Sequence, residues 1–145
     1  MFSSMTTRPD WDEYFLQLAS AVSVRADCTR SKVGAVLVDS FHRVLSVGYN
    51  GAPSGAPGCL TAGACPRGRL SYDELPPLGD YGTCIAIHAE SNAILFADPK
   101  RRKGSVLYIT RSPCTGCHQL ILKEGIKEIV WRGPDQSICK ERQFH

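Results

Sequence analysis

Hydrophobic periodicity divides the first third of the chain into a helix and two strands. Residues 11–22 carry apolar side chains at helical spacing, and Asp10 with Glu13 three residues later has the pattern of a capping box. We expect the aromatic residues of this helix to pack in the core. Residues 33–38 and 44–49 are short apolar runs rich in β-branched side chains, separated by a polar turn. They predict an antiparallel β-hairpin.

The rest of the chain predicts a long loop followed by alternating helices and strands. Residues 50–82 are dense in glycine and proline, and loops of that length are usually functional or disordered. The basic run at 100–103 is expected to form a solvated turn. Helices are predicted at 84–97 and 114–123, strands at 106–110 and 126–131, and a short helix or an irregular tail after residue 134. This alternation after an initial hairpin is typical of an α/β fold, here a three-layer α/β/α sandwich with a mixed central sheet.

Composition narrows the class of protein. A chain of 145 residues with a net charge of +3 fits one domain, residues 1–145, and an anionic small-molecule partner more readily than nucleic acid. The first ten residues hold no apolar run, and no stretch approaches the ~20 apolar residues of a membrane span, so we expect a cytoplasmic protein without a membrane partner. Seven cysteines in such a chain favour metal ligation, and their odd number excludes a fully disulfide-paired monomer.

Two short stretches carry the residues of a catalytic zinc site. One is His88-Ala89-Glu90, and the other is Pro113-Cys114-Thr115-Gly116-Cys117. His88, Cys114 and Cys117 supply three zinc ligands, and a tetrahedral zinc with three protein ligands has a fourth position for water. Because zinc lowers the pKa of that water to roughly 7, Glu90 beside it is the natural proton carrier.

The spacing of these residues restricts where they sit on helices. Residues two apart do not share a helix face, so His88 and Glu90 can both approach one metal only at the start of a helix. Cys114 and Cys117 are three apart and do share a face. Ser112-Pro113 before them is typical of a helix start. We therefore predict two helix starts that meet at one zinc ion.

His-x-Glu followed by Pro-Cys-x-x-Cys is the established signature of zinc nucleobase deaminases. The chain resembles the cytidine/deoxycytidylate deaminase superfamily here, and three further stretches, 28–36, 48–53 and 88–94, are similar to its deoxycytidylate branch. The resemblance runs from about Cys28 to Trp131. It implies a five-stranded sheet covered by helices on both faces, although only four strands are clear in the pattern. It also implies zinc-dependent deamination of a cytosine nucleotide, dCMP to dUMP and ammonia.

The resemblance also implies further roles. Asn50 would contact the substrate sugar, and the backbone near Ala89 would meet the pyrimidine edge. Some relatives are hexamers that deoxycytidine triphosphate regulates, so a homo-oligomer and a nucleotide effector are expected. Two departures affect substrate choice and regulation: residues 59–81 do not follow the better-known relatives, and Arg111 puts a charge where an uncharged pocket residue is expected.

Five cysteines lie outside the catalytic motif, and four of them precede His88: Cys28, Cys59, Cys65 and Cys84. We favour ordinary buried or free thiols, since free cysteine is among the most buried residue types. The alternative is a second, structural zinc with four thiolates, a closed site that would anchor the long loop. The resemblance supports this alternative, because some phage relatives carry a second zinc at positions that Cys28 and Cys59 match.

Three other functions remain open from the sequence. One is deamination of another cytosine nucleoside or nucleotide, and a second is deamination of a base in RNA, which would call for a broad basic surface and stacking aromatics. The third is a zinc-stabilised binding module, which would keep the ligands but would not need Glu90. The presence of Glu90 and the mild net charge favour a nucleotide enzyme.

Overall fold

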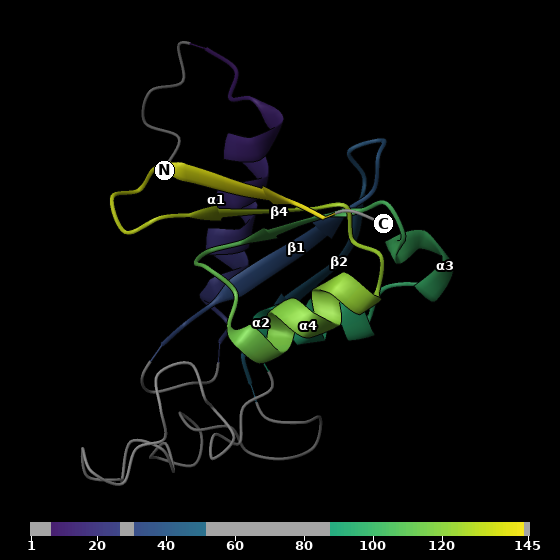
Figure 1. The fold of residues 1–145 in the computed structure, drawn as a ribbon. Helices are drawn as coiled ribbons and strands as arrows, with labels where there is room; N and C mark the ends of the chain where they lie inside the picture. The colour runs from purple at the N-terminus through teal and green to yellow at the C-terminus, as the bar shows by residue number, and fades with distance from the viewer. Residues whose placement is uncertain (1–6, 27–30, 52–87, 144–145) are drawn as a thin grey trace, which may run out of the picture.

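A five-stranded mixed sheet forms the centre of the structure, a computed structural model that describes residues 7–26, 31–51 and 88–143 (Figure 1). Its strands are β1 (Gly34–Val38), β2 (Val44–Tyr49), β3 (Val106–Ile109), β4 (Glu128–Arg132) and β5 (Ile138–Arg142), in the order β2-β1-β3-β4-β5. Only the β3–β4 pair is parallel, and the other neighbours are antiparallel. The predicted hairpin is the antiparallel β1–β2 pair.

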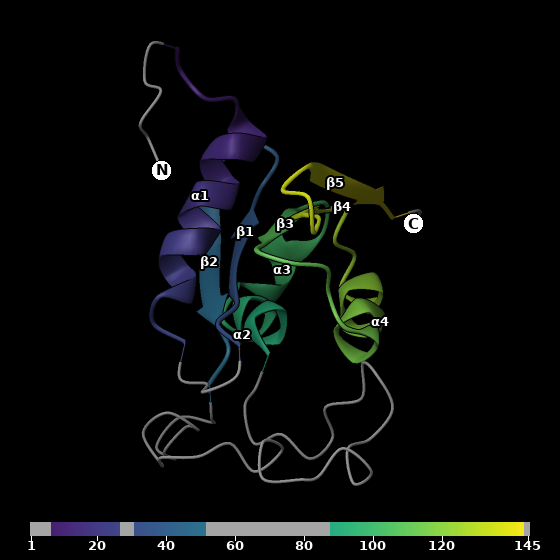
Figure 2. The ribbon, with the colours of Figure 1, turned by 90° about the vertical axis from the view of Figure 1, so that its left-hand side faces the viewer.

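Helices cover both faces of the sheet, as the α/β sandwich predicts (Figures 1 and 2). Helix α1 (Trp11–Ser23) packs on one face through a core of buried residues: Phe15, Leu16, Ala19, Val36, Val38, Tyr108 and Val130. Helices α2 (Ala89–Leu95) and α4 (Thr115–Lys123) pack on the other face, whose core includes Leu37, Ile94, Leu107, Ile121 and Ile129. Each face therefore has a core of its own, and β1, an interior strand between β2 and β3, is buried along its whole length.

Helix α1 begins where the sequence predicts, but its aromatic stripe is not entirely in the core. Asp10 is the N-cap and accepts a hydrogen bond from the Glu13 amide at 2.9 Å. Phe15 is buried, whereas Trp11 and Tyr14 are 52% and 43% exposed. The Trp11 ring stacks on His42 of the β1–β2 turn, with centroids 4.2 Å apart. Helical periodicity identified the helix correctly, but the stripe is wider than the face that the sheet covers.

The prediction of a short helix or an irregular tail after residue 134 is wrong, because this segment forms strand β5. Its exposed and half-buried positions alternate, but the exposed ones include Lys140 and Arg142, so the sequence shows no apolar alternation. Charged side chains of this kind are common on edge strands. Strand β5 pairs with β4 from Glu128 opposite Arg142 to Arg132 opposite Ile138. This pairing depends on tertiary contacts and has no local sequence pattern.

Two helices also differ from the predicted pattern. Helix α2 begins at Ala89, with His88 in an extended conformation as its N-cap, and not near Cys84, which lies outside the described residues. The basic run forms a short helix, α3 (Pro99–Arg102), capped by Asp98, where a solvated turn was expected. Two of its guanidinium groups make ion pairs, Arg101 with Asp39 at 3.0 Å and Arg102 with Glu124 at 2.9 Å.

The parallel β3–β4 pair determines where the functional residues meet. Parallel neighbours need a crossover connection, and α4 supplies it. The chain leaves β3 at Ile109 and enters α4 at Thr115, so residues 110–114 lie at one end of the sheet, near the start of α2 (Figure 1). None of the helices in the three described ranges is long and apolar enough to cross a membrane.

Candidate zinc centre and active site

Close packing against β2 holds the start of helix α2 in place. A side chain at Gly48 would collide with the backbone of Ala89 and Ala93, so only glycine allows this approach. The Asn92 side chain donates a hydrogen bond to the Tyr49 carbonyl at 2.7 Å, and the Ser46 hydroxyl donates to the Ala93 carbonyl. These contacts orient the first turn of α2, with His88 as its N-cap and Glu90 in the turn itself.

The start of helix α4 presents the two cysteines. Cys114 is the N-cap, in an extended conformation, and its Sγ accepts a weak hydrogen bond from the Cys117 amide at 3.4 Å. Cys117 lies in the first turn and is buried. The two predicted helix starts therefore do meet, and Cys114 itself is the N-cap of α4.

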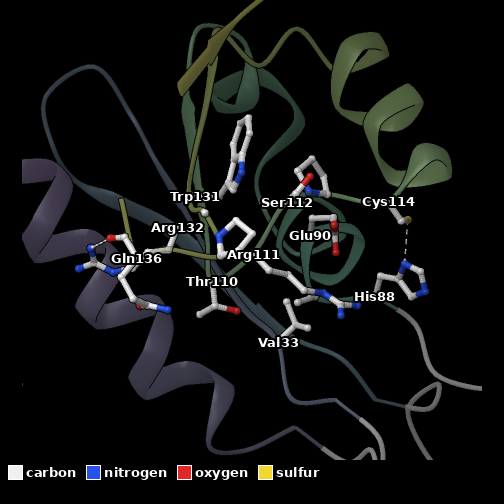
Figure 3. Close-up of a pocket in the computed structure, with 14 residues that line it drawn as sticks. Val33, His88, Glu90, Thr110, Arg111, Ser112, Cys114, Trp131, Arg132 and Gln136 are labelled. Atoms are coloured by element: carbon white, nitrogen blue, oxygen red, sulfur yellow. Dashed lines mark hydrogen bonds between the residues drawn. The ribbon is translucent and has the colours of Figure 1, made fainter. Parts of the chain in front are cut away.

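The three predicted ligands form a compact cluster (Figure 3). His88 Nδ1 lies 3.1 Å from Cys114 Sγ and 3.3 Å from Cys117 Sγ, and all three donor atoms lie within 4.8 Å of one another. Neighbouring nitrogen and sulfur ligands of a tetrahedral zinc are roughly 3.5 Å apart, given Zn–N of about 2.0 Å and Zn–S of about 2.3 Å. Among the described residues this is the one such group of histidine, cysteine or acidic side chains.

The electrostatics of the cluster also fit a bound dication. Burial, and then the nearby Glu90 carboxylate, raise the pKa of the Cys117 thiol well above its ordinary value. A thiolate here therefore needs a compensating positive charge, which zinc supplies. The Ser91 hydroxyl lies 3.3 Å from Cys117 Sγ and stabilises the same thiolate by hydrogen bonding. The residues present fit a catalytic zinc.

Glu90 is a buried carboxyl beside the ligand cluster. It is only 4% exposed, and this burial is the largest influence on its pKa, which it raises above the ordinary glutamate value. Weaker effects lower the pKa: hydrogen bonds to the carboxylate from the backbone of Glu90 itself and of Cys114, and the charges of His88 and Arg111. A carboxyl so placed titrates closer to neutral pH than an exposed one, which suits proton transfer.

A cavity of about 690 Å³ opens beside the cluster, within the usual size of small-molecule sites (Figure 3). Its lining includes His88, Ala89, Glu90 and Cys114 at one end and Trp131, Arg132 and Gln136 at the other. Arg111 lines it as well, so the unexpected charge does lie in the pocket. Arg132 is held by an ion pair from its Nη2 to Glu13 Oε1 at 2.6 Å.

The other predicted site residues have varied positions. Asn50 is 7% exposed, and its side chain accepts a hydrogen bond from the Val33 amide at 2.8 Å and donates one to the Ser31 carbonyl at 2.7 Å. It thereby braces Val33, which lines the cavity. His118 pairs with Glu141 at 2.9 Å and is not in the cluster. The predictions for a second zinc at Cys28, Cys59, Cys65 and Cys84 concern residues outside the described ranges.

Some residues of the site were not predicted from the sequence. Trp131 and Arg132 reach the cavity from the end of β4, which pairs in parallel with β3. Gln136 reaches it from the turn between β4 and β5, a hairpin that was not predicted. Ser91 was visible next to Glu90 in the motif, but its contact with Cys117 depends on how α2 and α4 pack. No local spacing signals such a contact.

The family model for the cytidine and deoxycytidylate deaminase zinc-binding region matches residues 9–132. The chain belongs to this deaminase family. The match covers both helix starts and strands β1 to β4. Deoxycytidylate deaminase of Mycobacterium phage D29 is 51% identical over 129 residues, which is 86% of this chain and 96% of that protein.

More distant relatives carry the same name. Deoxycytidylate deaminase of Schizosaccharomyces pombe is 40% identical over 126 residues, 86% of this chain, but the chain spans only 37% of that protein. The crystal structure of dCMP deaminase from the cyanophage S-TIM5 in complex with dCMP and dUMP is 27% identical. It superimposes with a TM-score of 0.61, over 87% of this chain and 83% of that one. These similarities agree with the cytidine deaminase-like sandwich.

Proposed function

We propose that this chain catalyses the zinc-dependent hydrolytic deamination of a cytosine nucleotide, converting dCMP and water to dUMP and ammonia. The observation that carries the proposal is the meeting of His88, Cys114 and Cys117 with the buried carboxyl of Glu90 at one end of a cavity. The 51% identity to a protein named deoxycytidylate deaminase supports dCMP as the substrate.

The reaction joins a water oxygen to C4 of the cytosine ring and breaks the bond from C4 to the exocyclic nitrogen. Zinc, when bound, supplies a Lewis acid that makes water nucleophilic near neutral pH. Glu90 takes the proton from the attacking water and delivers a proton to ring nitrogen N3. It then passes the second proton to the departing amine, which leaves as ammonia. The raised pKa of the buried Glu90 carboxyl suits a group that must both accept and return a proton.

Two further residues would orient the nucleotide. The backbone of Ala89 lies at the cavity wall next to Glu90, where it would meet the edge of the pyrimidine. Asn50 has a second amide hydrogen besides the one donated to Ser31, and this hydrogen would reach the sugar. Asn50→Ala should therefore raise the KM for dCMP. An unchanged KM would leave Asn50 as a brace for Val33 alone.

Ammonia release from a panel of substrates tests the proposal. Zinc-replete protein is incubated with cytidine, deoxycytidine, CMP, dCMP and dCTP, and with 5-substituted dCMP. We expect dCMP to have a kcat/KM well above that of deoxycytidine, because a charge-assisted contact to the phosphate is stronger than a neutral one. Equal kcat/KM for the nucleoside and the nucleotide would instead indicate a nucleoside deaminase.

The resemblance supports further parts of the same proposal. Residues 1–145 would act as a single deaminase domain in the cytoplasm, assembled as a homo-oligomer, with a hexamer as the first form to test, and deoxycytidine triphosphate would act as an effector. Light scattering on zinc-replete protein, with and without deoxycytidine triphosphate, measures the assembly. A monomer whose dCMP turnover does not respond to the triphosphate would remove both the oligomer and the effector.

A further inference from the structure

The charged side chains that line the cavity differ in what they contact. Glu90 and His88 lie at the end of the cavity that holds the zinc ligands, and the guanidinium of Arg132 is bound to other residues. Its Nη2 pairs with Glu13 at 2.6 Å, and its Nη1 donates to the Gln136 carbonyl at 3.1 Å. Arg111 also lines the cavity but has no hydrogen bond or ion pair with any residue in the described ranges. Its guanidinium is therefore the cation that this part of the chain leaves available for a ligand.

Arg111 follows strand β3, and its side chain lies toward the zinc end of the cavity. The zinc ligands lie at one end, and Trp131, Arg132 and Gln136 of the β4–β5 hairpin lie at the other. In Figure 3 the Arg111 side chain extends from the end of β3 toward Glu90 and His88, with Val33 beside it. The ring of a nucleotide must occupy the zinc end, where the chemistry takes place. Its sugar and phosphate must then extend along the cavity past Arg111.

We propose that Arg111 binds the 5′-phosphate of the substrate and is the residue that makes this pocket prefer a nucleotide to a nucleoside. The inference rests on the proposed function. A 5′-phosphate carries about −1.5 to −2 charges at pH 7. A guanidinium can donate two parallel hydrogen bonds to phosphate oxygens, and it keeps its charge at any pH that the protein tolerates. An exposed arginine at the cavity wall, which makes no ion pair with any described residue, provides that contact without breaking an ion pair in this part of the chain.

A rival role for Arg111 follows from its position near Glu90. Its charge acts on the Glu90 carboxyl, so the alternative role of Arg111 is in proton transfer and not in phosphate binding. The two roles predict different substrate dependence. A residue that serves Glu90 affects every cytosine substrate in proportion, mainly through kcat. A residue that binds the phosphate affects only nucleotides, mainly through KM.

The test compares wild type with Arg111→Gln and Arg111→Lys, each zinc-replete, on dCMP and deoxycytidine. We expect Arg111→Gln to lower kcat/KM for dCMP by about 10- to 100-fold through a higher KM, and to leave deoxycytidine unchanged. Arg111→Lys should recover part of the loss, because lysine keeps the charge but not the planar fork. Arg101→Gln is the matched control, since Arg101 is an exposed arginine on α3 that pairs with Asp39 and does not line the cavity.

Calorimetry with the product pair, dUMP and deoxyuridine, gives a readout that needs no turnover. Weaker binding of dUMP alone in Arg111→Gln supports the assignment. An equal loss for both ligands, or no loss for either, overturns it. If wild type deaminates neither dCMP nor deoxycytidine, the proposed function is wrong. The calorimetric comparison still decides whether Arg111 binds the phosphate.

Discussion

Each end of the sheet carries a cavity, and the acidic side chains that line the two cavities differ in number and in what they contact. The cavity opposite the zinc centre measures about 390 Å³, and its lining includes four carboxylates: Asp10, Asp12, Asp39 and Glu128. Each has a partner. Asp10 caps α1, Asp12 accepts from the Tyr108 hydroxyl at 2.8 Å, Asp39 pairs with Arg101, and Glu128 with Arg142 at 3.3 Å. At the zinc end, Glu90 is buried without an ion-pair partner within 4.0 Å among the described residues.

This difference appears in the pKa values. Hydrogen bonds, first from the Arg43 amide, lower the pKa of Asp39, whereas burial raises the pKa of Glu90. A carboxyl whose charge is already satisfied holds a turn or a helix end in place. A carboxyl kept from water, next to potential metal ligands, is suited to exchanging protons. The comparison predicts that catalysis depends on the zinc end and folding on the opposite end.

Removing a zinc ligand should have the largest effect. Cys114→Ala or His88→Ala takes away one of three protein ligands, so the protein should lose its catalytic zinc and its turnover together. Elemental analysis and dCMP turnover are measured on the same sample, and circular dichroism checks that the fold persists. Full activity in a metal-free preparation of either variant would contradict the account.

Changing Glu90 should separate proton transfer from zinc binding. Glu90→Gln keeps the shape of the side chain but cannot carry the proton, so turnover should fall by ~10²–10⁴-fold while zinc content stays normal. Steady-state kinetics and elemental analysis measure the two quantities. Turnover close to wild type with normal zinc would show that the proton carrier is another group.

Removing the Ser91 hydroxyl should weaken zinc binding without removing a ligand. Ser91→Ala deletes the hydrogen bond to Cys117 Sγ and leaves all three ligands present. Zinc affinity should fall by about 10- to 100-fold, the usual effect of losing such a supporting contact. Competition with a chromogenic chelator measures it, and Ser137→Ala, on the β4–β5 turn, is the control. Equal zinc affinity in Ser91→Ala and wild type would remove this contact from the account.

The smallest catalytic effect is expected at the opposite cavity. Asp12→Asn removes the charge that pairs with Lys140 at 2.6 Å and weakens the acceptor of the Tyr108 hydroxyl. Because Lys140 is largely exposed, the ion pair contributes little, and the free energy of unfolding should fall by only about 1 kcal/mol. Urea unfolding measures this loss, while kcat/KM for dCMP should stay within about twofold of wild type. A large fall in kcat/KM would mean that the two ends are coupled.

The zinc ligands and Glu90 could be predicted from the sequence because they lie within two short motifs. The spacing of His88 and Glu90 requires one helix start, and Ser112-Pro113 before Cys114 indicates the other. The far end of the cavity was missed, because Gln136 reaches it only through the pairing of β4 with β5. That pairing involves a polar edge strand, whose alternation carries no apolar signal. The exposure of Trp11 was missed for a similar reason, since periodicity does not show how much of a helix the sheet covers.

Metal removal and return tests the central claim most directly. The conversion of dCMP to dUMP is followed in one wild-type sample as purified, after dialysis against a chelator, and after zinc is added back, with His88→Ala treated in parallel. The account predicts that turnover disappears with the zinc, returns with it in wild type, and does not return in His88→Ala. Undiminished dUMP formation by the chelated, zinc-free wild type would contradict it.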